Sequence, residues 1–400
     1  MKRYLYVFGV LFTLSGTVFS QTAYDVVAPF IGIPGPGSRA EGLAQAYTAV
    51  ANDFAAAHYN PAGLAHITRS ELYVGGTYYL VNSTTETNVG QPVSASIDRS
   101  YFHNNSIGYL YPIANTKVTL GMGYYATGFF DRALRFRTAG GYQEEDTEEV
   151  MLGSYTLTGG YQLNPDLSVG ATLHFYRGQN NYAFNASDLN YQIESTYSGL
   201  GLTFGFLYTG IQHLRTGMNV KTPITLDVDE TYTEVESDQY DYRVKSPLSV
   251  SLGQAFNFGP VLVAGNITWR DWTLSRFKQD PNSPTLVDEN GIPLDVSINS
   301  SIQENYTSGL EALEYGAGGE VLLPVVNAKV RGGMRYVPSY RKDSALSDTI
   351  VLSLGGSIVL AQQFKIDMSY SRATRDQTYS NGWVADITNS WLTMNFSYRF

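Results

Sequence analysis

From Glu71 to the C-terminal Phe400, apolar side chains recur at every second position over many successive segments. A period of two is the pattern of a β-strand with one apolar face. In the last segment the two faces are Leu392, Met394, Phe396, Tyr398 and Phe400 against Thr393, Asn395, Ser397 and Arg399. A chain with this pattern folds into antiparallel β-structure, either a soluble sandwich or a membrane barrel.

The connections between these segments distinguish the two folds. We count 14 segments, and the expected strands span residues 70–82, 100–113, 116–130, 148–163, 166–183, 192–210, 213–230, 236–256, 260–278, 302–321, 326–338, 348–361, 364–375 and 387–400. Connections after even-numbered strands are a few residues long, whereas most of those after odd-numbered strands are long and polar. This arrangement is typical of bacterial outer-membrane barrels. We therefore predict an all-β fold, a 14-stranded antiparallel transmembrane β-barrel over residues 67–400.

The N-terminus reads as a secretory signal over residues 1–20. Lys2 and Arg3 precede an apolar run from Tyr4 to about Phe12, and cleavage is expected after Ser20. A helical membrane anchor is the less favoured alternative, because the apolar run is too short to span a bilayer. The signal is consistent with a protein that crosses the inner membrane and folds beyond it.

Composition excludes several classes of protein. The chain carries 26 Lys and Arg against 36 Asp and Glu, a net charge of −10, which argues against a nucleic-acid partner. It contains no cysteine, so it has no disulfide, no thiolate metal site and no thiol nucleophile. Its 31 tyrosines suit the two membrane interfaces, and its 39 glycines suit curved strands.

One stretch, residues 38–65, lacks the period of two. Ser38 and Glu41 match a capping box, and the apolar residues that follow predict a helix that continues to Val50. A second short helix is expected over 54–58, ending at Asn60-Pro61. Fourteen strands enclose a lumen too wide for side chains alone to fill. We therefore predict that residues 21–66 form a small helical plug, or hatch, inside the barrel.

Several short motifs, in order along nearly the whole chain, resemble one family of proteins. They are Gly37-Ser38-Arg39-Ala40, Asn60-Pro61-Ala62-Gly63-Leu64-Ala65, and the stretches 214–223, 246–252, 267–277, 353–356 and 367–370. Their sequence and order resemble the FadL/TodX family of outer-membrane transporters for long-chain fatty acids and other hydrophobic compounds. The resemblance implies a plugged barrel, with Asn60, Pro61 and Ala62 as the plug motif, and passive transport of a hydrophobic small molecule without a cofactor.

The same resemblance implies a lateral gate where the third strand kinks inward. Gly121, Gly123 and Gly128 are the candidates for that kink, because glycine interrupts strand ladders. The alternative is that they are ordinary strand glycines.

Candidate ligand-binding residues fall into two groups. Phe54, Tyr59 and Leu64 of the plug are the apolar candidates for the floor of a pocket. The cations on the predicted lumen face are Arg270, Lys329, Arg331 and Arg335. Such cations would hold a substrate carboxylate well. Alternatively, they pair with lumen acids such as Asp367 and Glu320.

The remaining expectations concern partners. Phe396, Tyr398 and the terminal Phe400 resemble the signal read by the barrel assembly machinery. We expect a monomer in contact with outer-membrane lipid and lipopolysaccharide. The acidic runs 144–149 and 227–241 are expected in long loops or at their edges, and they lack the spacing of a calcium loop, so no metal site is predicted.

Other functional classes fit less well. The five histidines show no metal-binding spacing, and no Ser–His pair is distinguished by its spacing, so we predict no catalytic residue and no cofactor. Two non-transport alternatives remain for a barrel of this kind. One is a PorV-like scaffold for a protein secretion system, and the other is an adhesin-like surface barrel.

Overall fold

The computed structural model describes residues 23–30, 35–86, 94–137, 143–186, 189–234, 237–283, 285–288, 290–342, 347–378 and 384–400. The predicted signal sequence, residues 1–20, lies outside the described residues. Among the described residues, no helix is long and apolar enough to cross a membrane.

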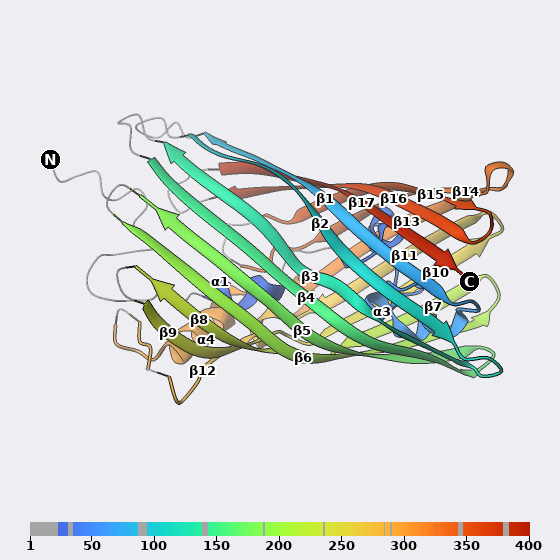
Figure 1. The fold of residues 1–400 in the computed structure, drawn as a ribbon, viewed down its shortest axis with the longest axis horizontal. Helices are drawn as coiled ribbons and strands as arrows, with labels where there is room; N and C mark the ends of the chain where they lie inside the picture. Colours follow the sequence, from blue (N-terminus) through green and yellow to red (C-terminus); the bar gives the residue numbers. More distant parts are fainter. Residues whose placement is uncertain are drawn as a thin grey trace.

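A single antiparallel sheet dominates the molecule (Figure 1). Its segments are β1 (Glu71–Glu86), β2 (Ser94–Pro112), β3 (Val118–Arg137), β4 (Gln143–Asn164), β5 (Leu167–Asn185), β6 (Asn190–Ile211), β7 (Leu214–Lys221), β8 (Thr225–Thr233), β9 (Ser237–Lys245), β10 (Ser249–Phe258), β11 (Val261–Arg270), β12 (Arg276–Gln279), β13 (Leu313–Leu323), β14 (Ala328–Val337), β15 (Thr349–Leu360), β16 (Phe364–Thr378) and β17 (Val384–Arg399). The helical segments are α1 (Ala23–Val27), η1 (Ala28–Phe30), α2 (Ser38–Gly42), α3 (Ala56–Tyr59), η2 (Pro61–His66), η3 (Trp272–Leu274), α4 (Leu294–Asn305), η4 (Gly309–Ala312) and η5 (Pro324–Val326).

The 17 segments make 14 barrel strands, because three strands are each interrupted once (17 − 3 = 14). β7 continues as β8, β9 as β10, and β11 as β12. Pro223 and Pro247 lie in the first two interruptions, where proline removes a ladder donor, and η3 forms the third. The predicted 14-stranded antiparallel barrel is confirmed.

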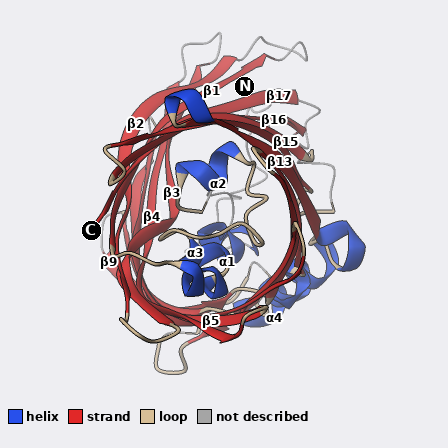
Figure 2. Ribbon diagram, turned by 90° about the vertical axis from the view of Figure 1, so that its right-hand side faces the viewer, coloured by secondary structure: helices blue, strands red, loops and turns tan. Residues whose placement is uncertain are grey.

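Pairing of the first strand with the last closes the barrel. β1 pairs with β17 from Glu71↔Arg399 to Thr85↔Ala385, and the view along the barrel shows a complete ring of strands (Figure 2). Closure removes the free first and last edges of the sheet, as a barrel surrounded by lipid requires. β4 and β6 each contain 22 residues, about twice the length needed to cross a bilayer, so the wall extends beyond the membrane.

The alternation predicted for the strands is observed. In β17 the polar Thr393 and Asn395 are buried toward the lumen, whereas Phe396 and Tyr398 are exposed on the outer face. The outer face of such a barrel is apolar because it contacts lipid, and this explains its many exposed aromatic and aliphatic residues.

Residues 38–66 lie inside the ring (Figure 2). The helix predicted to reach Val50 is wrong, because α2 ends at Gly42 and the following Ala44 and Gln45 have left-handed backbone. The capping box is also wrong. The Ser38 side chain makes no cap bond, and the Glu41 carboxylate accepts a hydrogen bond from the Trp391 indole instead.

One further expectation is corrected at the end of the barrel with the long connections. The tenth strand begins at Leu313 and not at residue 302, because residues 294–305 form α4 with Leu294, Ile298 and Ile302 on one buried face. The acidic runs lie at the edges of the connections, since residues 144–149 belong to the first residues of β4 and most of residues 227–241 to the adjoining ends of β8 and β9.

Candidate functional site

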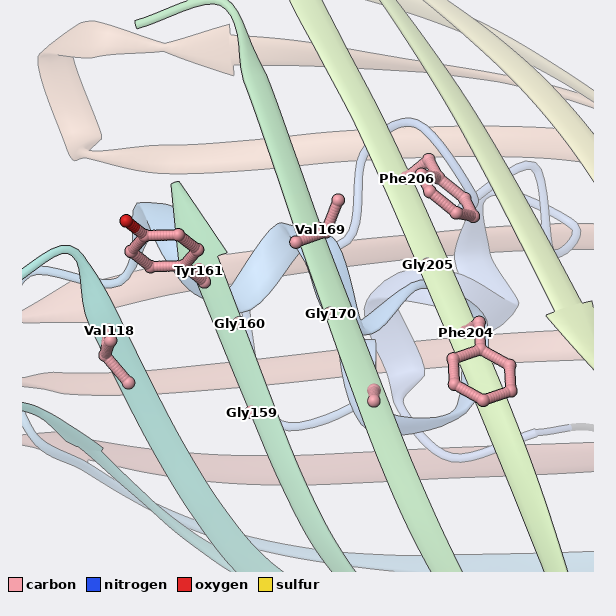
Figure 3. A pocket seen from close by; sticks show the side chains of 10 residues that line it. Val118, Gly159, Gly160, Tyr161, Val169, Gly170, Phe204, Gly205 and Phe206 are labelled. Atoms are coloured by element: carbon pink, nitrogen blue, oxygen red, sulfur yellow. The ribbon is translucent and has the colours of Figure 1, made fainter. Parts of the chain in front are cut away.

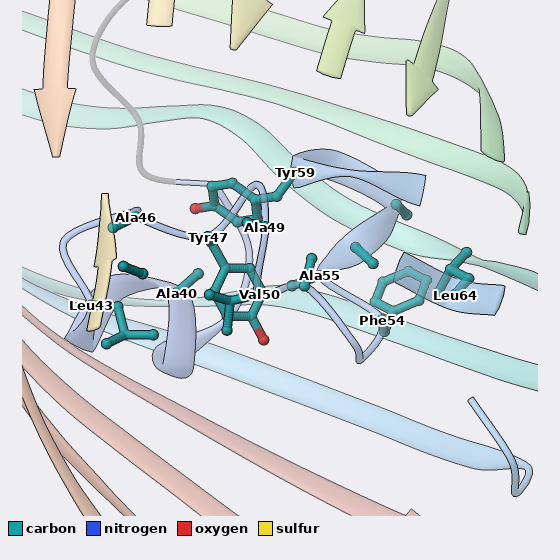
Figure 4. Packing of buried hydrophobic residues seen from close by; sticks show 14 of the residues in the cluster. Ala40, Leu43, Ala46, Tyr47, Ala49, Val50, Phe54, Ala55, Tyr59 and Leu64 are labelled. Carbon is teal, nitrogen blue, oxygen red and sulfur yellow. The ribbon is translucent and has the colours of Figure 1, made fainter. Parts of the chain in front are cut away.

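The plug has its own compact apolar core (Figure 4). Tyr47 contacts Tyr59 edge to face, with ring centroids 5.4 Å apart. Phe54 is fully buried and packs against Tyr73 of β1, at 5.7 Å between centroids. The three predicted apolar candidates, Phe54, Tyr59 and Leu64, are therefore all part of this core, and Tyr59 also lines a cavity.

The predicted plug motif fastens the plug to the wall. The Asn60 amide nitrogen donates to the carbonyl oxygens of Thr48 in the plug, at 2.7 Å, and of Phe206 in β6, at 3.0 Å. Its side-chain oxygen accepts a bond from the Ala62 N–H at 3.1 Å, which holds the turn at Pro61. One buried amide thus bonds the plug turn and the barrel at the same time.

Three glycines of the wall allow this turn to approach closely. Gly160, Gly170 and Gly205 are direct neighbours on β4, β5 and β6, and we call them the glycine patch (Figure 3). A Cβ atom at Gly170 would overlap the Pro61 carbonyl carbon, so any larger residue there would force the turn to shift. On the outer face of the same strands, Tyr161, Phe204 and Phe206 border an apolar hollow. The high glycine content is evident from the sequence, but this patch is not. Its three members lie far apart in the sequence and become neighbours only through the pairing of the strands.

A buried charge cluster forms a second attachment. Arg39 of α2 reaches across to β13, where its Nε and Nη2 atoms donate to the two carboxylate oxygens of Glu320, each at 3.0 Å. On β14, Lys329 contacts Glu320 at 2.7 Å, and Arg331 contacts both Glu320 and Asp367. Lys329 and Arg331 are thus paired with Glu320 and Asp367, the lumen acids that were the alternative partners to a substrate carboxylate. The ion pair between Arg39 and Glu320 was not predicted from the sequence.

Arg270 and Arg335, the other two predicted cations, line a small polar cavity between the plug and the wall. Tyr59 and His58 of the plug face the same cavity, as does Lys221 of β7. The Lys221 ammonium lies 2.8 Å from Nε2 of His58. Burial, together with the neighbouring Lys221 charge, lowers the pKa of His58 well below its usual range, so its imidazole is neutral.

The hydrogen-bonded ladder between β2 and β3 is interrupted. Their ladder runs from Pro112↔Thr119 to Ser106↔Tyr125, stops, and resumes in the same register at Ser96↔Arg135. Residues 97–105 still pair with β1, and residues 126–134 still pair with β4, so two well-paired strands border the gap.

Irregularities on both strands mark the start of this gap. Thr127 is an extra residue in β3 opposite β4, and its hydroxyl bonds to the Leu152 carbonyl oxygen at 3.2 Å. On β2, the register with β1 shifts where Asn104 and Asn105 lie opposite Gly76. Two adjacent asparagines in a strand are the sequence signal that could have indicated this position.

The three predicted gate glycines do not all lie at the interruption of the ladder. Gly121 and Gly123 lie in the paired part of the ladder, opposite Leu110 and Gly108. Only Gly128 lies at the bulge, and a Cβ there would be 3.4 Å from the Pro29 carbonyl oxygen of η1. The N-terminal segment thus passes directly behind the start of the gap.

A second apolar cluster is separate from the plug core; we call it the upper cluster. It joins α1, α4 and the interrupted strands, with Trp272, Phe277, Ile298, Ile302, Tyr242 and Val27 among its members. The Asn299 side chain binds the free edge of β12 by accepting from the Phe277 N–H and donating to its carbonyl oxygen, both at 2.9 Å. Sequence reasoning missed this cluster because α4 falls in a segment predicted as loop and strand.

The polar side chains of the lumen also include a buried Ser–His pair, Ser154 on β4 with His174 on β5. His174 Nδ1 lies 3.0 Å from the Ser154 hydroxyl, and its Nε2 lies 2.8 Å from the Thr203 hydroxyl. Both residues of the pair are fully buried, and no carboxylate is bonded to this histidine in the described part of the chain. Over the same residues there is no group of His, Cys, Asp and Glu that would hold a metal ion. The pair is therefore a bonded part of the barrel interior.

Comparisons with known proteins agree with this architecture. The family model described as outer membrane protein transport protein (OMPP1/FadL/TodX) matches residues 35–240, which is more than half of the chain. A search of curated protein sequences found no match.

Among solved structures, a FadL homologue from Pseudomonas aeruginosa is similar over 92% of this chain and 99% of its own, with a TM-score of 0.69 and 14% identity. The toluene transporter TodX of Pseudomonas putida gives a TM-score of 0.64 at 14% identity, covering 93% and 100% of the two chains. The toluene transporter TbuX of Ralstonia pickettii gives 0.61 at 14% identity, covering 90% and 98%. At these identities the structures establish a shared fold.

Proposed function

Because the chain belongs to the OMPP1/FadL/TodX family of outer-membrane transport proteins, we propose that it carries hydrophobic small molecules inward through the outer membrane by passive diffusion. Its substrates are of the long-chain fatty acid or aromatic hydrocarbon type. The protein is an outer-membrane β-barrel, and its family consists of transport proteins rather than enzymes. The family match does not favour a secretion-system scaffold.

The observation that carries the proposal is the combination of a filled lumen with an open ladder in the wall. The plug is bonded to the wall through Asn60 and Arg39, so the axial path is blocked. The gap between β2 and β3 is a lateral path in its place. A hydrophobic molecule in the lumen would leave through this gap into the bilayer, where an apolar environment receives it.

No energy source is required for this movement. Transfer of apolar surface out of water releases about 25 cal/mol per Å² buried. The protein has only to provide a path past the polar lipopolysaccharide layer, which hydrophobic molecules cross slowly.

The parts of the chain then have separate roles. Residues 21–66 act as the plug, with Asn60-Pro61-Ala62 as its attachment, and residues 67–400 form the barrel. The bulge at Thr127-Gly128 sets the lateral gate. The exposed Phe396, Tyr398 and Phe400 on the last strand are the assembly signal, and the barrel acts as a monomer in lipid and lipopolysaccharide.

Uptake and binding together test the proposal. The protein is expressed in a bacterial strain that lacks its own transporter of this kind, and entry of a radiolabelled long-chain fatty acid and of an alkylbenzene is measured. Binding of both compounds to the purified barrel in detergent is measured in parallel. Saturable binding and accelerated entry of at least one compound are expected. If neither compound binds and neither enters faster, the proposal is wrong.

A further inference from the structure

The apolar hollow on the outer face of the barrel lies directly behind the wall that carries the plug turn; we call it the outer hollow. It has a volume of about 360 Å³ and extends across β3, β4, β5 and β6 (Figure 3). Its floor contains Gly159 and Ala171, which are direct neighbours in the strand register. Larger side chains surround this floor, namely Val118, Tyr161, Val169, Phe204 and Phe206. Because the floor carries almost no side chain, the wall here is little more than backbone.

The outer hollow is a dent in the wall and not an opening. β4, β5 and β6 pair without interruption across it, so the backbone groups of its floor are hydrogen-bonded. Its lining is almost entirely apolar. It is continuous with the rest of the outer face, where Leu120 and Leu157 are exposed. Since the outer face of such a barrel contacts lipid, the outer hollow faces the acyl chains of the membrane.

The position of the outer hollow along the strands places it in one leaflet of the membrane. Val118 is the first residue of β3, and Val169 lies close to the start of β5. Both strands begin at short connections, which lie on the periplasmic side in barrels of this kind. At about 3.3 Å per residue, the lining is confined to about the periplasmic half of the membrane span. The leaflet on that side of an outer membrane consists of phospholipid, whereas lipopolysaccharide occupies the other leaflet.

Charged residues lie at the periplasmic end of the outer hollow. Lys117 directly precedes Val118 and is exposed. Its carbonyl oxygen accepts a hydrogen bond from the Gln162 N–H at 3.0 Å, which holds it beside Tyr161. An ammonium group at the membrane surface attracts the phosphate of a lipid headgroup. Asp166, in the connection between β4 and β5, is also exposed and suits the ammonium of an ethanolamine headgroup.

The plug is bonded to the lumen side of the same backbone. The Phe206 ring borders the outer hollow, while the Phe206 carbonyl oxygen accepts the hydrogen bond from Asn60 of the plug. The space that a Cβ would need at Gly160 and at Gly170 is taken by the plug turn at Pro61. A chain in the outer hollow and the plug turn would thus pack against opposite faces of one thin part of the wall.

From these observations we propose that the outer hollow binds one acyl chain of a phosphatidylethanolamine molecule of the periplasmic leaflet, with Lys117 as the partner of its phosphate. The lipid fills the dent and supports the thin wall from outside, so it stabilises the seated plug. A molecule that binds only the folded barrel raises its stability as the concentration of that molecule rises. The inference concerns a lipid that stays in place, and it goes beyond the proposed transport function without depending on it.

The test measures retention of lipid by the full-length barrel. The purified protein in neutral detergent is titrated with phosphatidylethanolamine, and native mass spectrometry counts the bound molecules. Ala171→Leu fills the outer hollow, and Ala317→Leu, at an exposed position of β13, is its matched control. Lys117→Gln removes the cation, and Lys278→Gln removes an exposed cation from β12, at the end of the barrel with the long connections. Retention of the folded, heat-sensitive mobility on electrophoresis shows that each variant forms its barrel.

We expect the unaltered protein, Ala317→Leu and Lys278→Gln each to retain one phosphatidylethanolamine with similar affinity. Ala171→Leu should lose about tenfold in affinity, because the chain no longer fits, and Lys117→Gln about fivefold. Lys117→Gln should leave the affinity for a diacylglycerol with the same chains unchanged, because that lipid has no phosphate. Added phosphatidylethanolamine should raise the thermal unfolding midpoint and slow proteolysis of the plug, and it should do so much less in Ala171→Leu.

Three results would assign the outer hollow differently and overturn the inference. Equal retention by Ala171→Leu and Ala317→Leu shows only the general layer of lipid around a barrel. Tighter retention of lipopolysaccharide than of phosphatidylethanolamine places the site in the wrong leaflet. A dimer that dissociates in Ala171→Leu makes the outer hollow an interface between two copies of the chain. Retention of lipid without any effect on the plug overturns the proposed support of the plug.

Discussion

The Nε atom of Arg39 in the plug lies 3.0 Å from Oε2 of Glu320 in the barrel wall, across 281 residues of sequence. Both side chains are almost completely buried, at 10% and 3% exposure. Because Glu320 also binds Lys329 and contacts Arg331, one carboxylate serves three cations. The position of the plug therefore depends on a buried charge cluster that joins α2 to β13 and β14.

Removal of either partner should strongly destabilise the folded protein. Breaking a buried ion pair typically costs about 3–5 kcal/mol. Arg39→Met should lower the thermal unfolding midpoint in detergent, and Glu320→Gln should lower it further, because it leaves three cations without their shared acid. Arg243→Met is the comparison, since its pair with Asp227 is about half exposed and screened by solvent, so its loss should change stability little. Equal effects of Arg39→Met and Arg243→Met would contradict the assigned role of the cluster.

The glycine patch makes a second prediction about the plug. In Gly170→Ala the new methyl group would overlap the Pro61–Ala62 peptide, so the plug turn must shift, at a cost of about 1–3 kcal/mol. A lower unfolding midpoint and faster proteolysis of the plug are expected. Gly265→Ala is the matched control, because the nearest atom to its Cβ would be 3.8 Å away. If the two variants behave alike, close packing at the patch is not what holds the turn.

The wall of the barrel could be predicted because lipid and lumen impose opposite chemistry on alternate residues. The faces of β17 follow directly from the sequence, and so does the closed strand count. The charge cluster could be anticipated only in part. Glu320 and Asp367 were recognisable as partners for lumen cations, but a contact between Arg39 and Glu320 depends on how the plug is seated.

The helices of the plug and helix α4 of the upper cluster were harder to predict, for two different reasons. Helical periodicity predicted one continuous helix through residue 50, whereas tertiary packing against the wall breaks it at Ala44 and Gln45. In α4, Leu294, Ile298 and Ile302 do show helical spacing, but they fall among polar residues and precede a strong strand pattern. The glycine patch and the ladder gap depend on register between strands, which periodicity within one strand does not contain.

Protonation of His58 should make stability depend on pH. Its pKa in the folded protein is lowered, so between that value and the unfolded value of about 6.5 the unfolded chain binds more protons than the folded one. Stability is therefore fully present above about pH 6.5 and decreases as the pH falls below it. Thermal unfolding midpoints from pH 7.5 to 5 should decline, and His58→Gln should reduce that decline. An identical pH profile in the variant would show that other groups cause the dependence.

The ladder gap between β2 and β3 gives the sharpest test of lateral transport. Ala126 and Gly128 pair with the consecutive residues Gly153 and Leu152, and Gly76 lies opposite both Asn104 and Asn105. Deleting Thr127 and Asn104 together therefore removes one extra residue from each strand and keeps the register of β3 with β4, of β2 with β1 and of β2 with β3. Regular strands should then extend the β2–β3 ladder across the gap and close it. We expect the deletion variant to fold, to bind ligand, and to lose most uptake of the hydrophobic compound. Thr127→Ala is the control, because it loses only the hydroxyl bond to Leu152 and keeps the extra residue, so its uptake should be nearly normal. Normal uptake by a folded deletion variant would mean that the substrate does not leave through this gap.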